Sequence, residues 1–452
     1  MRNLLQSAAA RASRYLEDIQ ERRVRPSEEA VRGLDQFREP MPEAGTDPEE
    51  VLSILDDFGS PGTIGCAGPR FFGFVIGGTL PAALAANWMA TAWDQNASRM
   101  ASSPVSMVLE EVSLAWLTDI LGLPEGCGAG FVTGGTIANF TALAAARHAV
   151  LDRAGWDVER DGLFGAPKVE VVVGGEAHPS LSKSLGMLGL GRERVTAVPV
   201  DRQGRMIAAK FPELRGPAIV CLQAGNVNTG AFDPAREIIA KAHAAGAWVH
   251  VDGAFGLWAA ASPGLKHLVD GYADADSWAT DAHKWLNVPF DSGVAFVRDP
   301  QVLRAAMSIV APYLPVGASR EPSQYTPELS RRARGVDIWA ALKSLGRSGV
   351  AEMIERDCRC ALRFAAGLRD VGFEILNDVV LNQVLVSFGP PEVTNAIVEA
   401  IQAEGTCWCG PTVWQGRTAM RISVCSWRTT EEDIERSLAA ILQVAEEVIS
   451  RR

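Results

Sequence analysis

The strongest constraint on the fold is an alternation of short apolar runs with helix-like segments between residues 128 and 300. The runs are apolar on both faces, which is typical of strands that helices cover on both sides. They comprise residues 131–133, 169–173, 218–222, 247–251 and 294–297. Strands that alternate with helices predict an α/β protein with a mostly parallel central sheet.

Ligands of such sheets bind at the carboxyl ends of the strands. Four polar clusters follow the apolar runs of this chain and are therefore expected at that edge. The clusters are Thr133-Gly134-Gly135-Thr136, Ala177-His178-Pro179-Ser180, His250-Val251-Asp252-Gly253-Ala254 and Asp281-Ala282-His283-Lys284-Trp285.

Lys284 lies in a mostly apolar stretch, where a lysine without a partner is unusual. A desolvated pocket favours the neutral amine, which can attack a carbonyl group. Asp281 and His283 are placed to orient this amine and to help hold a phosphate group. The alternative is a surface lysine at the end of a strand.

Each of the other clusters has a chemical and a structural interpretation. Asp252 could pair with a protonated pyridine nitrogen, or it could be a turn aspartate before glycine. Gly134 and Gly135 precede an alanine-rich helix, whose N-terminus could bind phosphate, or they form a plain glycine turn. His178 could stack on a flat heteroaromatic ring, or it is a hydrogen-bonded turn histidine.

Taken together, the clusters resemble the group II pyridoxal-5′-phosphate (PLP)-dependent amino-acid decarboxylases, the family of glutamate, aromatic-amino-acid and tyrosine decarboxylases. The similarity runs from about residue 60 to the C-terminus. It also rests on Pro69-Arg70-Phe71-Phe72-Gly73, on Ser102-Ser103-Pro104, on Asn139 and on Trp285-Leu286.

The resemblance implies fold type I, the aspartate-aminotransferase-like arrangement, and a homodimer. Lys284 would carry PLP as a Schiff base, Asp252 would hold the ring nitrogen, and His178 would stack on the ring. The remaining cofactor contacts implied are Gly134, Gly135, Thr136, Asn226, Asn228, Ala254, Asp281 and His283.

The substrate is less well defined. The resemblance places Phe72, Asn96 and Ser98 at the substrate, and the stretch 93–99 is more polar here than in aromatic-specific relatives. A loop predicted at 311–327 corresponds to the family's catalytic loop but is shorter. Within it Tyr325 is the candidate proton donor.

The expected reaction is therefore α-decarboxylation of a small-molecule L-amino acid to the primary amine. The alternative is another PLP reaction on the same scaffold, namely transamination, aldolase-type cleavage or oxidative deamination. A non-catalytic PLP-binding protein is the third class, and the presence of Lys284, Asp252 and His178 together argues against it.

We expect three parts: a helical dimerisation segment at 1–65, a large PLP-binding domain at 66–345 and a small α+β domain at 346–452. A long helix is predicted near 335–365. The last helix is predicted to begin with a capping box of Thr429 and Glu432.

Composition excludes some classes of function. The net charge of −11 argues against a nucleic-acid binder, and no apolar window is long enough for a membrane span. The eight cysteines lack zinc-site spacing, so no metal is expected and reduced thiols in the cytoplasm are predicted. The first sixteen residues are basic and without acids, which fits an amphipathic helix or, as the alternative, a transit peptide.

Overall fold

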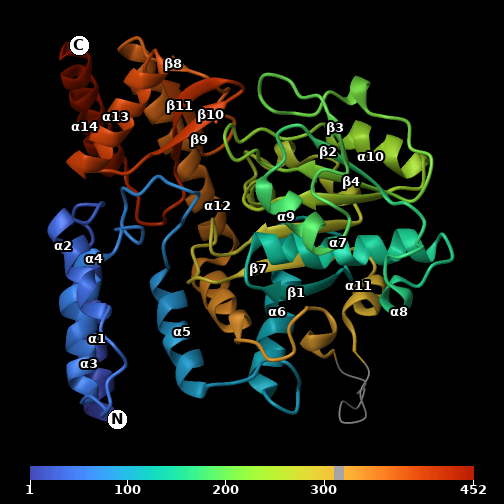
Figure 1. Cartoon of the computed structure of the whole chain (residues 1–452), viewed down its shortest axis with the longest axis horizontal. Coiled ribbons are helices and arrows are strands. Elements are labelled where there is room, and N and C mark those ends of the chain that lie inside the picture. The colour runs from blue at the N-terminus through green and yellow to red at the C-terminus, as the bar shows by residue number, and fades with distance from the viewer. Residues whose placement is uncertain (310–319, 452) are drawn as a thin grey trace. The chain divides into compact units, whose positions relative to one another are not determined.

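The computed structural model describes residues 1–309 and 320–451, and the chain divides into two compact units (Figure 1). The larger unit comprises Thr79–Arg359 and Asn377–Gln383. The smaller unit comprises Met1–Gly78, Cys360–Leu376 and Val384–Arg452. The predicted boundaries at 65 and 345 do not coincide with these units, because the first 78 residues share a unit with C-terminal residues.

The larger unit is built on a seven-stranded sheet with the order β1-β7-β6-β5-β4-β2-β3. Its strands are β1 (Gly128–Val132), β2 (Glu170–Gly174), β3 (Val195–Val198), β4 (Ala218–Gln223), β5 (Trp248–Asp252), β6 (Ser277–Asp281) and β7 (Gly293–Val297). The pairs from β3 to β6 are parallel, whereas β7 is antiparallel to both β1 and β6. The predicted mostly parallel sheet is confirmed, and the sequence analysis assigned no strand to β3 or β6.

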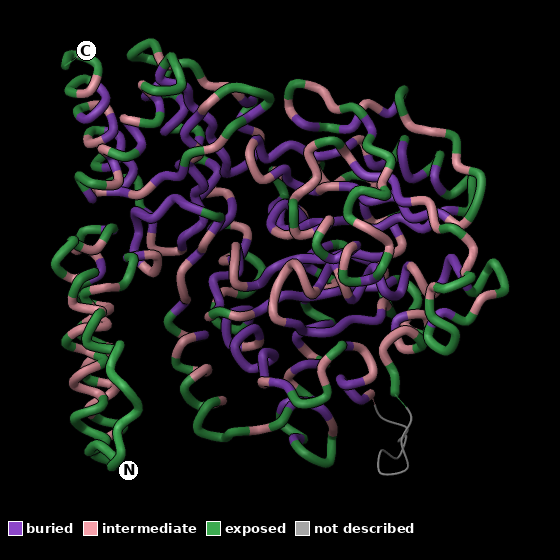
Figure 2. The backbone as a smooth tube through the Cα atoms, viewed as in Figure 1, coloured by how far each residue is buried: buried purple, intermediate pink, exposed green. Residues whose placement is uncertain are grey.

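Helices cover this sheet, and α7 packs against β5, β6 and β7. Four of the helices begin with proline, whose missing N–H costs no helical hydrogen bond at that position. The helices of this unit are α5 (Pro81–Trp93), α6 (Pro104–Ile120), α7 (Gly135–Asp152), α8 (Val158–Asp161), α9 (Pro179–Met187), α10 (Ala235–Ala244), α11 (Pro300–Met307) and the part of α12 (Arg334–Asp370) up to Arg359. Its 3₁₀ turns are η3 (Ala208–Lys210), η4 (Gly256–Ala261), η5 (Lys266–Val269), η6 (Tyr272–Asp274) and η7 (Pro322–Gln324). The strands β1, β5, β6 and β7 are buried along their whole length (Figure 2). The long helix predicted near 335–365 is α12, and it is kinked at Gly346, where φ is +61°.

The smaller unit contains a four-stranded sheet with the order β10-β11-β9-β8. Its elements are β8 (Glu374–Ile375), β9 (Gln383–Ser387), β10 (Gly410–Trp414), β11 (Arg417–Ser423), α13 (Pro391–Glu404) and α14 (Glu431–Ser450). The capping box of α14 is formed by Thr430 and Asp433 rather than by Thr429 and Glu432. The prediction was one residue early because the hydroxyl of Thr429 donates instead to the backbone oxygen of Pro69, at 2.7 Å.

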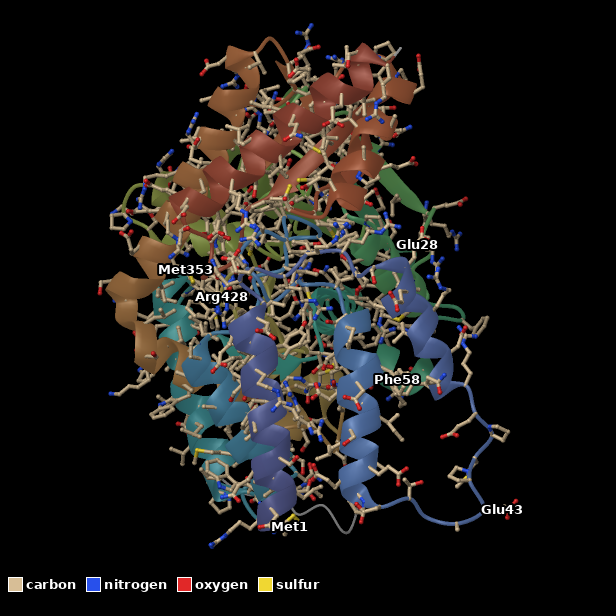
Figure 3. All side chains as sticks on the ribbon, turned by 90° about the vertical axis from the view of Figure 1, so that its left-hand side faces the viewer. Met1, Glu28, Glu43, Phe58, Met353 and Arg428 are labelled. Atoms are coloured by element: carbon tan, nitrogen blue, oxygen red, sulfur yellow. The ribbon has the colours of Figure 1, made fainter. Side chains whose placement is uncertain are left out.

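The N-terminal part of the smaller unit is helical (Figures 1 and 3). It consists of α1 (Arg2–Asp18), α2 (Glu28–Gly33), η1 (Leu34–Phe37), α3 (Pro48–Ile54), the π-helical turn η2 (Leu55–Gly59) and α4 (Ser60–Gly62). None of these elements contains a buried residue. Ion pairs from Arg11 to Glu49 and Asp56 tie α1 to α3 and η2. Among the described helices of the chain, none combines the length and the apolar character that crossing a bilayer requires.

Candidate active site

Lys284 follows strand β6 in a short turn and forms an ion pair with Asp281, the last residue of that strand. Nζ of Lys284 lies 3.0 Å from Oδ2 of Asp281, whose side chain is 3% exposed, whereas the lysine side chain is 19% exposed. Oδ1 of Asp281 is buried and has no hydrogen-bond partner within the described residues. The cluster thus combines a partly exposed amine with a carboxylate that retains an unused acceptor.

His283 faces the same carboxylate. Its Nδ1 accepts a hydrogen bond from the backbone N–H of Ser292 at 3.1 Å, so a neutral ring carries its proton on Nε2. Nε2 lies 3.8 Å from Oδ1 of Asp281. Burial lowers the pKa of His283, which favours the neutral ring.

The turn from β1 into α7 approaches this cluster closely. Gly134 is the N-cap of α7 and offers no side chain to cap it, so the first N–H groups of the helix need another partner. A Cβ atom on Gly135 would lie 2.8 Å from Oδ2 of Asp281, and one on Gly134 would lie 3.1 Å from Cε1 of His283. Glycine at both positions lets the helix N-terminus, including Thr136, reach the cluster.

Asp252 ends strand β5 and is 5% exposed. Its Oδ1 accepts a hydrogen bond from the backbone N–H of Ala254 at 3.2 Å, and its Oδ2 accepts one from Nδ2 of Asn139 at 3.0 Å. Asn139 lies one helical turn after Gly135 on α7. The same helix therefore connects Asp252 with the Lys284 cluster.

His178 is the N-cap of α9. Its Nδ1 accepts a hydrogen bond from the backbone N–H of Ser180 at 3.2 Å and lies 2.7 Å from the Ser180 hydroxyl. His178 and Asp252 line one small cavity of about 10 Å³, together with residues from the ends of β2 and β4. The structure therefore brings these two predicted site residues together.

Asn226 and Asn228 lie in the loop that follows β4. Oδ1 of Asn226 accepts hydrogen bonds from the backbone N–H groups of Asn228 and Thr229, at 2.9 and 3.2 Å. Its Nδ2 donates to Oε1 of Gln223 at 3.0 Å and to the backbone oxygen of Glu176 at 3.3 Å. The side chain of Asn226 thus fixes the conformation of this loop through four hydrogen bonds. The cofactor contacts expected of Asn226 and Asn228 stay predictions.

The three predicted substrate residues lie in different units. In the larger unit, Asn96 accepts a hydrogen bond from the backbone N–H of Arg331 at 3.2 Å and lines a polar cavity of about 510 Å³. Ser98 is buried, with its hydroxyl 3.4 Å from that of Ser102. In the smaller unit, Phe72 is buried and packs edge-on against Phe364. Their contact with a substrate stays a prediction.

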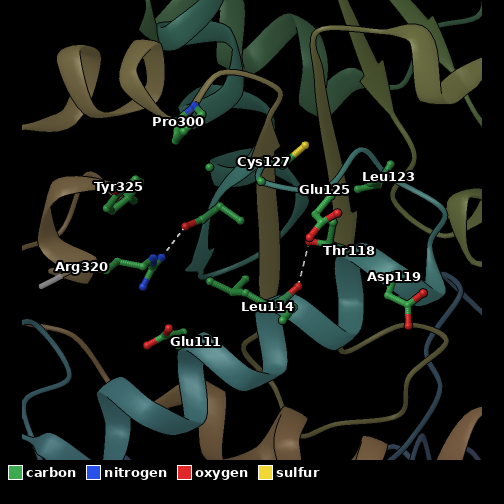
Figure 4. Close-up of a pocket in the computed structure, with 14 residues that line it drawn as sticks. Glu111, Leu114, Thr118, Asp119, Leu123, Glu125, Cys127, Pro300, Arg320 and Tyr325 are labelled. Carbon is green, nitrogen blue, oxygen red and sulfur yellow. Dashed lines mark hydrogen bonds between the residues drawn. The ribbon is translucent and has the colours of Figure 1, made fainter.

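Tyr325 lies beside the start of β1, the end of the strand opposite the Gly134–Gly135 turn. It lines a cavity of about 670 Å³ with residues of α6 and with Cys127 (Figure 4), and the guanidinium of Arg320 lies 4.7 Å from its ring centre. The structure does not bring Tyr325 into contact with the Lys284 cluster of the same chain. Residues 310–319, which include most of the predicted loop, lie outside the described residues.

A comparison with family models gives one match that covers most of the chain. Residues 36–389 match the pyridoxal-dependent decarboxylase conserved domain. The chain belongs to the pyridoxal-dependent decarboxylase family. PLP is therefore its cofactor, and amino-acid decarboxylation is the reaction that the family membership assigns to it.

Individual relatives agree with this assignment. The chain is 25% identical over 437 residues to an aromatic-L-amino-acid decarboxylase of Bacillus atrophaeus, covering 92% of this chain and 89% of the relative. It is 30% identical over 444 residues to an L-2,4-diaminobutyrate decarboxylase of Rhizobium meliloti, covering 93% and 86%.

The fold also matches solved structures. A structure of Oryza sativa TDC with PLP and tryptamine superposes with a TM-score of 0.92 at 23% identity, covering 99% of this chain and 97% of the other. This match confirms the predicted fold type I arrangement.

The residues of this decarboxylase fit PLP. Asp281 retains a buried acceptor, Asp252 is a carboxylate at the end of a central strand, and the α7 N-terminus lacks a side-chain cap. An aldehyde can join the amine of Lys284, and a phosphate matches uncapped N–H groups at a helix N-terminus.

Sequence reasoning gave no role to Asn139 or to His250, although both lie in the quoted motifs. The available signal was the spacing of His250 and Asp252, because residues two apart on a strand point to the same face. Asn139 could be linked to Asp252 only through the fold, since 113 residues separate them.

Proposed function

We propose that this chain removes the α-carboxylate of an L-amino acid as carbon dioxide and releases the primary amine, with PLP held on Lys284. The observation that carries the proposal is the double contact of α7. Its first residue, Gly135, approaches Asp281 beside Lys284, and Asn139 one turn later donates to Asp252. The amine of Lys284 and the carboxylates of Asp281 and Asp252 are thereby held near the N-terminus of α7.

Bound PLP supplies a flat ring that accepts the electrons left on the α-carbon when carbon dioxide departs. Asp252 would accept a hydrogen bond from the protonated ring nitrogen and keep the ring cationic. His178 would lie against one face of the ring and Ala254 against the other. Gly134, Gly135, Thr136 and His283 would bind the phosphate, with Asn226 and Asn228 as further contacts.

Phe72, Asn96 and Ser98 are each proposed to contact the substrate. The polar character of the stretch 93–99 favours a polar over an aromatic substrate side chain. The names of the relatives provide the first candidates, which are aromatic L-amino acids and L-2,4-diaminobutyrate. A panel that contains both classes separates these possibilities.

We propose that the working form is a homodimer. Helices α5 and α6 of the larger unit expose six large apolar side chains at 37–55% of their surface, which is unusual for a surface that faces only water. They are Trp88, Met89, Trp93, Val105, Val108 and Trp116. A second copy of the chain would cover them.

We also propose a cytoplasmic location. All eight cysteines are present as thiols, including the closely spaced Cys358/Cys360 and Cys407/Cys409. Thiols persist in reducing compartments, whereas secreted proteins commonly pair their cysteines.

The reaction is tested by measuring carbon dioxide and products for each amino acid of the panel. Stoichiometric carbon dioxide and primary amine support decarboxylation. A requirement for an oxo acid as co-substrate would indicate an aminotransferase instead, and aldehyde with ammonia would indicate oxidative deamination. A protein that binds PLP but changes no amino acid would contradict the proposal.

A further inference from the structure

A chain of five polar side chains runs through the interior of the larger unit and ends at Asp252. Trp248, His250 and Asp252 are alternate residues of β5, so their side chains point to the same face of the sheet. Asn139 from α7 and Ser277 from β6 complete the chain. His250, Asn139 and Ser277 are 0% exposed, so none of their polar atoms can exchange partners with bulk water.

The direction of the hydrogen bonds is fixed at the Trp248 end. An indole N–H is only a donor, and Nε1 of Trp248 donates to the hydroxyl of Ser277 at 2.9 Å. The Ser277 hydroxyl can then donate its own hydrogen to Nδ1 of His250, 3.0 Å away. His250 consequently carries its single ring proton on Nε2.

The same direction continues to Asp252. Nε2 of His250 lies 2.9 Å from Oδ1 of Asn139, which accepts the ring proton. The amide Nδ2 of Asn139 therefore faces Asp252 and donates to Oδ2 at 3.0 Å. A carboxylate at the end of this chain receives a hydrogen and supplies none, which is the situation of an ionised acid.

Asn139 also connects to the second predicted ring contact. Its Nδ2 lies 3.5 Å from the hydroxyl of Ser180, and that hydroxyl lies 2.7 Å from Nδ1 of His178. Since Nδ1 of His178 also accepts the backbone N–H of Ser180, a neutral His178 ring carries its proton on Nε2. The amide of Asn139 is thus connected to both side chains that are proposed to contact the ring of PLP, directly to Asp252 and through Ser180 to His178.

The opposite direction of hydrogen bonds is less favourable. It would exchange the positions of Oδ1 and Nδ2 in the Asn139 amide and place the His250 proton on Nδ1. It would also require a protonated Asp252. The Ser277 hydroxyl would then receive two hydrogens, from Trp248 and from His250. Its own hydrogen would have no acceptor within the described residues, and a buried unpaired donor is costly.

We infer that Asn139 and His250 are positioning residues of the cofactor site, which hold Asp252 as an anion and orient it through the single direction of this hydrogen-bond chain. The inference rests on the proposed function, in which Asp252 contacts the ring nitrogen of PLP. Neither residue is assigned contact with the substrate.

The surroundings support a chain that keeps its protonation over the ordinary pH range. Burial lowers the pKa of His250 to about 3. The titratable neighbours are Asp252 at the end of β5, His178 at the N-cap of α9 and Cys221 on β4, which pairs with His250 in the sheet. Burial and the charge of Asp252 raise the pKa of the Cys221 thiol, so it stays neutral as well.

The first test needs no cofactor. The full-length chain is labelled with ¹⁵N-histidine, and the imidazole signals of its six histidines are recorded from pH 6 to 9 without PLP. The His250 signal is assigned by its loss in His250→Gln. We expect a neutral ring with the proton on Nε2 at every pH. A proton on Nδ1, or a doubly protonated ring, would overturn the inference.

The second test compares the dissociation constant of PLP between variants by absorption and fluorescence. Asn139→Ala is expected to weaken PLP binding about 10- to 100-fold, the effect of losing a hydrogen bond to a charged group. The matched control is Asn377→Ala. Asn377 is also a buried asparagine of the larger unit, and its Nδ2 donates to the backbone oxygens of Thr229 and Gln383. We expect Asn377→Ala to change the dissociation constant of PLP by less than about threefold.

A second pair of variants distinguishes loss of the hydrogen bond from loss of folding. His250→Gln keeps a side-chain N–H that can donate to Asn139, whereas His250→Leu fills similar space without a donor. We expect the leucine variant to weaken PLP binding at least about tenfold more than the glutamine variant. Equal PLP affinities within both pairs would overturn the inference. Absence of PLP binding by the unaltered chain would instead contradict the proposed function, while the histidine signals still decide the direction of the chain.

Discussion

Nζ of Lys284 lies 3.0 Å from Oδ2 of Asp281, and the neighbouring Oδ1 has no hydrogen-bond partner within the described residues. The ion pair holds the amine at the end of β6, next to the N-terminus of α7. A partly exposed amine in this position is available to an aldehyde, whereas the buried carboxylate keeps it from turning toward solvent.

We therefore expect PLP to be attached at Lys284. Borohydride reduction of the protein with bound PLP, followed by peptide mapping, should place the pyridoxyl group on this residue. Lys284→Ala should lose the label, whereas Lys183→Ala, which alters an exposed lysine on α9, should keep it. A label on any lysine other than Lys284 would refute the assignment.

Asp252→Ala should weaken PLP binding and abolish nearly all turnover. Without the carboxylate, the ring nitrogen loses the partner that keeps it protonated and the ring accepts electrons poorly. Removal of one strong electrostatic contact of this kind costs about 10²–10³ in turnover. Turnover is measured at saturating PLP, so that weaker binding does not mimic the effect. A variant with near-normal turnover under these conditions contradicts the electron-sink role of Asp252.

Asp357 should make the protein less stable as the pH rises. Its carboxylate is buried and accepts a hydrogen bond from Nε1 of Trp285, next to Lys284, at 2.8 Å. Burial raises the pKa of Asp357 to about 7, above the value of about 3.9 in an unfolded chain. The folded protein therefore binds this proton more tightly, and the resulting stabilisation is complete below about pH 4 and lost as the pH rises through about 7.

Asp357→Asn should remove this pH dependence, because the amide oxygen still accepts from Trp285 and carries no charge. We expect the unfolding free energies of the two proteins to change differently between pH 5 and 8, by on the order of 1–4 kcal/mol. Urea midpoints at both pH values measure the difference. Burial raises the pKa values of Asp233 and Asp337 to about 6. Both residues are present in both proteins, so their contributions to the pH dependence of the unfolding free energy cancel in the comparison. Parallel pH profiles would show that Asp357 is not the titrating group.

Tyr325→Phe should leave the amine yield within about twofold of the unaltered protein, since its ring lines the cavity at the start of β1 (Figure 4). A proton donor would behave differently, because loss of general acid catalysis typically costs about 10²–10⁴ in rate. Product analysis by mass spectrometry distinguishes the two outcomes. A shift from amine to aldehyde would identify Tyr325 as the proton donor, as predicted from the sequence.

Val108→Asp should shift the protein toward monomers. Val108 is 54% exposed on α6, and a carboxylate buried there in an interface would be desolvated without a partner. Sedimentation at micromolar concentration measures the effect, and Val413→Asp, a 67% exposed position on β10, serves as the control. A Val108→Asp variant that sediments like the unaltered protein would remove α6 from the interface.

The sequence by itself determined the nature of the site. Asp252 and the Gly134–Gly135 turn each follow a predicted strand, Lys284 lies in a mostly apolar stretch, and the sheet topology places all three at one edge. Two-sided apolar strands also specified a buried sheet, because only helices on both faces can keep such strands from water.

Only the tertiary structure decided which of several local possibilities is realised. The sequence predicted a capping box of Thr429 and Glu432, whereas the folded chain forms it with Thr430 and Asp433, because the Thr429 hydroxyl donates to the backbone oxygen of Pro69. The direction of β7 and the position of Tyr325 likewise depend on contacts between distant residues. The chain from Trp248 to Asp252 draws its partners from α7, β5 and β6, since buried polar groups must satisfy one another and the fold alone determines which of them meet.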